Sequence, residues 1–287
     1  MLSCYWKTVL TLDPIKVWQA LVSAVFLEAV MRFKNQILAS IFSAVLSFGM
    51  LSPAHGAGEL EHVTLAVYVN PAGAPQGFLE DNLLHPRGVE IDIVYELQRR
   101  LMFNLKENRI YPLQRLDCFE RLRNGTADLV VGGISYTPER AKTYDFTPIF
   151  WESSLGVMYS TSRNVLRSEQ DLKGKRIGVE RGSTAEEYAS KLGATPVQFS
   201  NLTLACFLVA IGELDGLIYD RPPIEDFART VKSANLAVTE TPFGQEACMF
   251  AFALSKDSPY TEVISNTINQ MKEDGTIASI LKKWNTQ

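Results

Sequence analysis

The stretch NGTADLVVGGISYTPERAKTYDF, residues 124–146, passes from a turn through an apolar run into a Gly-Gly loop and a polar segment. The apolar run after the Asn-Gly turn is typical of a buried strand. Thr137 suits the N-cap of a helix, Pro138 its first position, and Glu139 the positive end of its dipole. We therefore expect a strand, a tight loop and a helix that begins near Thr137.

Arg140 lies in the first turn of this expected helix, where its charge opposes the helix dipole. Free backbone N–H groups at a helix start attract an anion, and an arginine can hold a carboxylate through two parallel hydrogen bonds. We interpret Arg140 as a candidate anchor for a carboxylate ligand. The alternative is a structural arginine paired with Glu139 or Asp145.

A second loop of the same kind is ERGSTAEEY, residues 180–188. Gly182 permits a tight turn, and Thr184 and Glu187 have the spacing of a capping box. Ser183 and Thr184 add hydroxyl groups to the free N–H groups of a helix start. The loop is therefore a second candidate anion site, and the alternative is a capped helix without a ligand.

Asp220 supplies the opposite charge at the end of the expected strand DGLIYD, residues 215–220. Open α/β sheets bind ligands at the carboxyl ends of their strands, where both anion loops also lie. A carboxylate between two such sheets would meet Arg140 from one side and Thr184 from the other, and Asp220 could accept hydrogen bonds from an ammonium group. The alternative for Asp220 is a helix cap or a partner of Arg221.

Strands alternate with helices along the rest of the chain, which predicts an α/β protein with parallel sheets. The roughly 230 residues that follow the leader suit two lobes of about 100–120 residues each. Strand-rich segments near 148–160 and 246–255 would form two β connections between the lobes. We expect one lobe from 58–151 with 250–287, and the other from 152–249.

The N-terminal segment 1–57 has the features of an extension followed by a secretory signal. Arg32 and Lys34 precede the apolar run ILASIFSAVLSFGML, which is followed by small residues. The signal would start at Met31 and be cleaved near residues 56–57, which predicts a periplasmic protein. The alternative is a membrane-bound leader built from residues 17–30, although Glu28 and the short length argue against it.

Composition excludes several other classes of function. The chain has 287 residues, a formal net charge of −4 and no basic patch, so nucleic-acid binding is not expected. Only three histidines occur, and the cysteine spacing matches no zinc pattern, so neither a metal nor another cofactor is expected. Cys118, Cys206 and Cys248 follow the leader, and they allow either buried free thiols or one disulfide, such as Cys206–Cys248.

The motifs together resemble the family 3 periplasmic solute-binding proteins of amino-acid ABC transporters. The resemblance covers the whole chain after the leader and is carried by residues 88–97, 119–150, 172–184, 215–220 and 271–284. Its most specific parts are residues 124–146 and 274–284. It implies a two-lobed clamp that closes on a small ligand. It also implies a monomeric binding protein, not an enzyme, that delivers its ligand to an inner-membrane ABC permease.

The resemblance assigns roles to individual residues. The α-carboxylate of an amino acid would be held by Arg140, Ser135, the backbone of Gly133 and, from the second lobe, Thr184. The α-ammonium would be held by Asp220 and by a carbonyl near Gly133. These roles agree with those inferred above from the two anion loops and the aspartate.

The ligand side chain would meet an unusual set of residues. Gly73 occupies a position that is often aromatic in the family, and Phe78 is a substitute if the loop is longer. Arg115 falls on a gate position, and Asn70 falls where basic amino acids are often met by Asp. An arginine at the gate would repel a basic side chain, so we expect glutamate, aspartate or glutamine as ligand. The alternative is that Arg115 points to solvent.

Two other functions on the same fold stay open at this point. The first is an enzyme of the cyclohexadienyl dehydratase kind, for which Glu90, Glu152 and Glu180 are candidate general acids by residue type alone. The second is a sensory module that presents its ligand to a membrane receptor.

Overall fold

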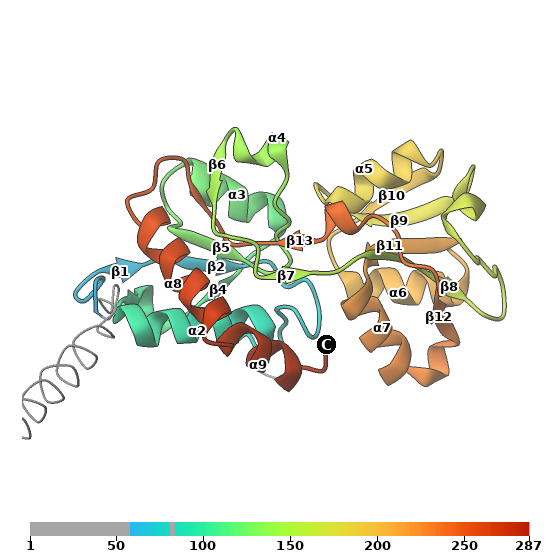
Figure 1. Ribbon diagram of the computed structural model, residues 1–287. Helices are drawn as coiled ribbons and strands as arrows, with labels where there is room; N and C mark the ends of the chain where they lie inside the picture. The colour runs from blue at the N-terminus through green and yellow to red at the C-terminus, as the bar shows by residue number, and fades with distance from the viewer. Residues whose placement is uncertain (1–57, 81–83, 287) are drawn as a thin grey trace, which may run out of the picture. The chain divides into compact units, whose positions relative to one another are not determined.

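The computed structural model describes residues 58–80 and 84–286, and the expected leader, 1–57, lies outside them. Two five-stranded sheets carry the described chain (Figure 1). We call the sheet β4-β2-β5-β14-β6 with its helices the first lobe, and the sheet β10-β9-β11-β8-β12 with its helices the second lobe. The predicted two-lobed α/β architecture is confirmed.

The first lobe is built on three parallel strands, β4 (Tyr111–Pro112), β2 (Val67–Val69) and β5 (Leu129–Val131). Alternate residues of β2 face opposite sides of the sheet. Val67 and Val69 lie in one hydrophobic cluster and Tyr68 in another. Both faces are therefore buried, as the continuous apolar run of β5 also indicates.

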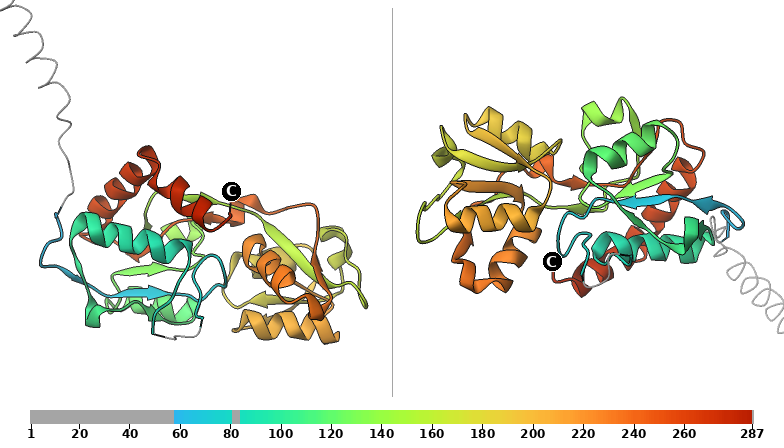
Figure 2. Two further views of the ribbon diagram at one scale, coloured as in Figure 1. Left: turned by 90° about the horizontal axis from the view of Figure 1, so that it is seen from below. Right: turned by 180° about the vertical axis from the view of Figure 1, so that it is seen from behind.

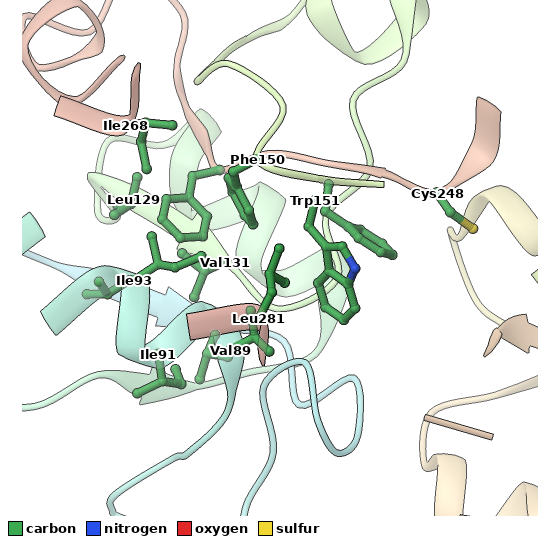
Figure 3. Close-up of a cluster of buried hydrophobic side chains, with 14 of the residues drawn as sticks. Val89, Ile91, Ile93, Leu129, Val131, Phe150, Trp151, Cys248, Ile268 and Leu281 are labelled. Carbon is green, nitrogen blue, oxygen red and sulfur yellow. The ribbon is translucent and has the colours of Figure 1, made fainter. Parts of the chain in front are cut away.

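Helices cover both faces of this sheet (Figures 1 and 2). They are α2 (Val89–Leu101), α3 (Arg115–Arg123), α4 (Pro138–Ala141), α8 (Thr261–Glu273) and α9 (Thr276–Lys283). Figure 3 shows Ile93 of α2 and Ile268 of α8 in the same cluster as Val131 of β5. Gly275, with φ of 80°, separates α8 from α9.

The second lobe repeats this plan. Its parallel strands are β9 (Arg176–Glu180), β10 (Thr195–Phe199) and β11 (Gly216–Asp220), and its helices are α5 (Thr184–Lys191), α6 (Leu202–Ile211) and α7 (Arg221–Thr230). The sheet is completed by β8 (Leu155–Ser160) and β12 (Leu236–Val238). The short 3-10 turn η2 (Glu169–Leu172) lies between β8 and β9, and η3 (Lys232–Ala234) lies between α7 and β12. A third turn, η4 (Gln245–Ala247), follows β12.

Two antiparallel strands link the sheets, β7 (Trp151–Glu152) and β13 (Met249–Phe250). Along the chain, β7 follows β6 (Tyr144–Phe146), and β13 comes directly before β14 (Ala253–Ser255). The expected parallel pairing is found between β4, β2 and β5 and between β10, β9 and β11. In addition, β14 runs antiparallel to β5 and β6, and β8 runs antiparallel to β11 and β12. The chain crosses between the sheets at these strands, so they enter each sheet in the opposite direction. The residue limits expected for the lobes stay a prediction.

The segment 103–112 of the first lobe does not form one continuous strand. It forms β3 (Asn104–Leu105), the 3-10 turn η1 (Lys106–Asn108) and β4. Glu107 and Asn108 adopt φ values of 50° and 54°, which no extended strand can contain. β3 pairs instead with the short β1 (Thr64–Leu65), outside the main sheet.

The cysteines in the described chain are free thiols. Cys118, Cys206 and Cys248 are all buried, so the Cys206–Cys248 disulfide is excluded and the expectation of buried thiols is confirmed. None of the described helices has the length and apolar content needed to cross a membrane.

Candidate ligand-binding site

The loop after β5 is held by a buried carboxylate. Gly132 and Gly133 have φ values of 97° and 66°, and their N–H groups donate to Glu90 Oε2 and Oε1 at 2.6 and 2.7 Å. Burial raises the pKa of Glu90 to about 7, although the hydrogen bond from Gly132 acts in the opposite direction. Glu90 therefore positions the loop from α2, since both of its oxygens are occupied by backbone donors.

Asn70, at the end of β2, braces the same loop. Its Nδ2 donates to the Gly132 carbonyl at 3.2 Å, and its side chain is buried. A Cβ on Gly132 would overlap the Asn70 carbonyl oxygen, so only glycine fits there. The structure thus gives Asn70 a scaffold contact at the edge of the site.

Arg115 is buried, and the alternative that it points to solvent is wrong. Its Nη1 donates to the Gly133 carbonyl at 2.8 Å, and its Nη2 and Nε donate to Glu180 Oε2 at 2.6 and 3.2 Å. The Tyr219 hydroxyl donates to the same oxygen at 3.1 Å. Burial acts to lower the pKa of Arg115, but the interactions with Glu180 and with its other neighbours, Tyr219 and Asp220, together outweigh burial, so the pKa is raised.

Asp220, the last residue of β11, forms no side-chain cap on α7, and Arg221 pairs with Glu225 instead. Asp220 Oδ2 accepts a hydrogen bond from Gln76 Nε2 at 3.2 Å, and Oδ1 accepts one from Cys248 Sγ at 3.3 Å. Burial raises the pKa of Asp220 to about 6. Within the described residues the hydrogen-bond donors to this carboxylate are neutral, although the charge of Arg115 acts to lower its pKa. A cationic ligand group would stabilise the ionised form further.

Gln76 belongs to this cluster, although sequence reasoning missed it. Its side chain is fully buried, and in the described structure its Oε1 has no hydrogen-bond partner. A Cβ placed on Gly133 would lie 3.1 Å from this oxygen and 3.5 Å from Asp220 Oδ2. The only sequence signal was a polar residue in the loop after β2, where an α/β sheet binds its ligands.

Arg140 lies in α4, which begins where the sequence predicted. Thr137 caps this helix, and its Oγ1 accepts a hydrogen bond from the Arg140 backbone N–H at 3.1 Å. The guanidinium donates to two carbonyls, those of Ser135 at 2.9 Å and Gly182 at 3.0 Å. Burial, and secondarily the charge of Arg115, lowers the pKa of Arg140 to about 10. The charged form of Arg140 is therefore less stable here than in water, and a bound anion would stabilise it.

The acidic partners considered for Arg140 are occupied elsewhere. Glu139 pairs with Lys142, and Asp145 pairs with Lys256 at 3.0 Å. Within residues 58–80 and 84–286, Arg140 forms no ion pair. Its charge is therefore available to an incoming carboxylate.

The second anion loop differs from its prediction by one position. Ser183 is the N-cap of α5, and its Oγ accepts from the Glu186 N–H at 3.3 Å. The capping box expected from Thr184 and Glu187 is wrong, because the Gly182 turn leaves Ser183 extended, with φ −86° and ψ 164°, and the helix begins at Thr184. The buried Thr184 hydroxyl donates to the Ala247 carbonyl at 3.0 Å.

The structure brings the charged groups of both lobes around Gly133. The Gly133 N–H donates to Glu90 and its carbonyl accepts from Arg115, and a Cβ placed on Gly133 would lie close to Gln76 and Asp220. Glu180 joins this cluster through its ion pair with Arg115. Arg140 lies in α4, further along the chain, and its guanidinium donates to the Gly182 carbonyl of the second anion loop. Opposite charges on either side suit a zwitterion, and the described residues contain no group of His, Cys, Asp or Glu able to hold a metal ion.

Comparison with known proteins identifies the class. Residues 65–287 match the family model described as bacterial extracellular solute-binding proteins, family 3. The chain belongs to this family. The resemblance seen in the sequence motifs is therefore confirmed, and the family is one of binding proteins.

Among the curated family 3 relatives, the amino-acid-binding protein AabA of Dichelobacter nodosus is 29% identical over 205 residues, covering 69% of this chain and 79% of AabA. A probable histidine-binding protein of Campylobacter jejuni is 25% identical over 224 residues, covering 77% and 85%. A solved ancestral arginine-binding protein bound to glutamine superimposes with a TM-score of 0.70 at 27% identity, covering 77% and 97%.

Proposed function

We propose that this family 3 protein captures a polar amino acid outside the cytoplasm and delivers it to an inner-membrane ABC permease. The observation that carries the proposal is a pair of opposite charges, Arg140 in α4 and Asp220 at the end of β11, neither of which forms an ion pair within residues 58–80 and 84–286. The names of the family 3 relatives, which bind amino acids, support it.

The α-carboxylate would bind Arg140. A guanidinium has five N–H donors, and the two carbonyl bonds of Arg140 use two of them. Those that remain can form a charge-assisted pair with a carboxylate. Ser135 would assist from the first lobe, and Ser183 and Thr184 from the second. The Gly133 N–H, which the sequence also suggested for this role, already donates to Glu90, so it does not belong to the proposed carboxylate site.

The α-ammonium would bind Asp220, with Gln76 Oε1 as a second acceptor. These two groups are adjacent, and the Gln76 oxygen is a buried acceptor that an ammonium N–H would satisfy. Glutamate, aspartate and glutamine are the ligands that the sequence favours. The protein would act as a periplasmic monomer without a cofactor, after cleavage of its leader near residues 56–57.

A thermal-shift screen against the amino acids tests this function. A ligand at 100 times its dissociation constant stabilises the folded protein by about 2.7 kcal/mol. Stabilisation by at least one polar amino acid, and not by its deaminated or decarboxylated analogue, is expected. If no amino acid raises the melting temperature of the folded protein, the proposal is wrong.

We propose that the chain is not an enzyme. Of the candidate acids, Glu90 is bonded to two backbone amides, Glu180 is paired with Arg115, and Glu152 is exposed on β7. None of the three is therefore a free proton donor facing a ligand. Turnover of prephenate or arogenate would contradict this, and permease genes next to the coding gene would favour transport over a sensory role.

A further inference from the structure

The ion pair between Arg115 and Glu180 joins the start of α3 in the first lobe to the end of β9 in the second. The Arg115 Nη2–Glu180 Oε2 distance is 2.6 Å, and the two side chains are only 4% and 8% exposed. Arg115 also donates to the Gly133 carbonyl, and Gly133 lies against Asp220. The pair is therefore part of the same polar cluster as the proposed ammonium site.

We propose that the Arg115–Glu180 pair selects amino acids with uncharged side chains, and prefers those that carry an amide or a hydroxyl group. The inference rests on the proposed function and narrows it from polar amino acids to one charge class. It also replaces the reasoning that made Arg115 a free positive charge, because that charge is already paired.

The balance of buried charges carries the argument. The zwitterionic head group of an amino acid uses Arg140 and Asp220, one for each of its charges. Arg115 and Glu180 then compensate each other, so no buried charge remains for the ligand side chain. A lysine or glutamate side chain would have to break the pair or stay without a counter-ion, and an unpaired buried charge is strongly unfavourable.

The hydrogen bonds of the pair favour the same class of ligand, amino acids with an uncharged polar side chain. Arg115 Nε, Arg115 Nη2 and the Tyr219 hydroxyl all donate to Glu180 Oε2, and no donor to Oε1 occurs within the described residues. The hydrogen bonds that Arg115 donates to Glu180 and Gly133 use three of its five N–H groups. The pair thus keeps both an acceptor and donors, and a primary amide matches both at once.

Other titratable groups in the cluster do not alter this balance. Both oxygens of Glu90 accept backbone N–H groups of the Gly132–Gly133 loop, so Glu90 is already committed to that loop. Burial raises the pKa of Tyr219 well above 10, so its hydroxyl stays neutral. Neither group offers a charge to the ligand side chain.

Calorimetric titration of L-glutamine, L-glutamate and L-lysine into the full mature protein tests the proposal. Wild type should bind glutamine at least about tenfold more tightly than the two charged amino acids. Glu180→Gln frees Arg115, so the glutamate-to-glutamine Kd ratio should fall at least about tenfold. Arg115→Gln leaves Glu180 alone, so the lysine-to-glutamine Kd ratio should fall by a similar factor, about tenfold.

The double variant Arg115→Gln/Glu180→Gln should restore the wild-type ranking, because the pair is then neutral on both sides. Glu213→Gln, at an exposed glutamate of the second lobe, is the matched control and should change nothing. If Arg115→Gln does not fold, Glu180→Gln and the double variant still decide the question.

The outcomes separate the two proposals. If wild type binds no amino acid, the proposed function fails, and this inference fails with it. If glutamine binds but Glu180→Gln leaves the glutamate-to-glutamine ratio unchanged, only the inference is overturned. Tightest binding of lysine or glutamate by wild type would overturn it as well.

Discussion

Arg140 is a cation whose polar side-chain contacts are two main-chain carbonyls, those of Ser135 and Gly182. Arg140→Ala should weaken amino-acid binding by at least about 2 kcal/mol, because it leaves a desolvated ligand carboxylate without its partner. Titration calorimetry on the folded variant checks this, and Arg123→Ala, at an exposed arginine of α3, is the control. Equal affinities for wild type and Arg140→Ala would rule out the anchoring role.

Asp220 should make binding depend on pH. Its pKa is about 6 because the carboxyl is buried, and an ammonium group binds only the ionised form. Affinity should therefore be constant above pH 6 and fall as the pH drops through this value, by about tenfold per pH unit.

Asp220→Asn should abolish this pH dependence and weaken amino acids more than ligands that lack the amine. Titrations between pH 4.5 and 8 measure both effects. A wild-type affinity that does not change across this range, or equal losses for both kinds of ligand, would show that Asp220 does not hold the ammonium.

Gln76 combines a useful contact with an unsatisfied oxygen. Gln76→Leu removes the bond to Asp220 but also the buried acceptor without a partner, so the free energy of unfolding should change by less than about 1.5 kcal/mol. Affinity for amino acids should still fall about fivefold to tenfold, because the ammonium loses an acceptor. Chemical denaturation and calorimetry measure the two quantities, and an unchanged affinity would exclude Gln76 from the site.

At the scale of elements, the site depends on how β2, β5 and α2 meet. Gly132 is enclosed by the Asn70 backbone, and its N–H group is bonded to Glu90 from α2. This loop is therefore fixed by contacts to two other elements before any ligand binds. Because the loop is already ordered, less conformational entropy is lost when a ligand binds.

Gly132→Ala should lower the free energy of unfolding by more than about 2 kcal/mol, because the new methyl overlaps a backbone carbonyl at a positive φ. Gly125→Ala is the matched control: its φ is 70°, but a Cβ there meets nothing within 4 Å. Gly125→Ala should lower the free energy of unfolding by about 1 kcal/mol, because a residue with a Cβ is less stable at a positive φ. Similar losses for both variants in urea denaturation would contradict the fixed-loop interpretation.

At the scale of the whole molecule, we predict that the protein loses its leader on export. The leader carries four basic and two acidic residues, so its removal would take the formal net charge from −4 to −6. Mass spectrometry of the exported protein should find an N-terminus close to residues 56–57. An exported protein that keeps Met31 or any residue before it would disprove cleavage at this position.

The local signals of the sequence determined the strand-loop-helix units and two of the charged site residues. Thr137 and Pro138 set the start of α4, which places Arg140, and the apolar run of β11 places Asp220 at a strand end. Such signals work because capping, turn conformation and side-chain periodicity are settled within a few residues. The family motifs are made of these same local units, which is why the fold could be predicted.

Only the tertiary structure decided how the charges are paired. Arg115 meets Glu180 across 65 residues of sequence, and Gln76 meets Asp220 across 144. Burial and pairing depend on which distant segments pack together, and neither residue type nor spacing encodes this. The same is true of β8 and β14, whose antiparallel direction results from the chain crossing between the two sheets. The sequence therefore determined where Arg140 and Asp220 would stand, whereas the neutral Arg115–Glu180 pair and the free oxygen of Gln76 exist only because folding brings distant segments into one buried cluster.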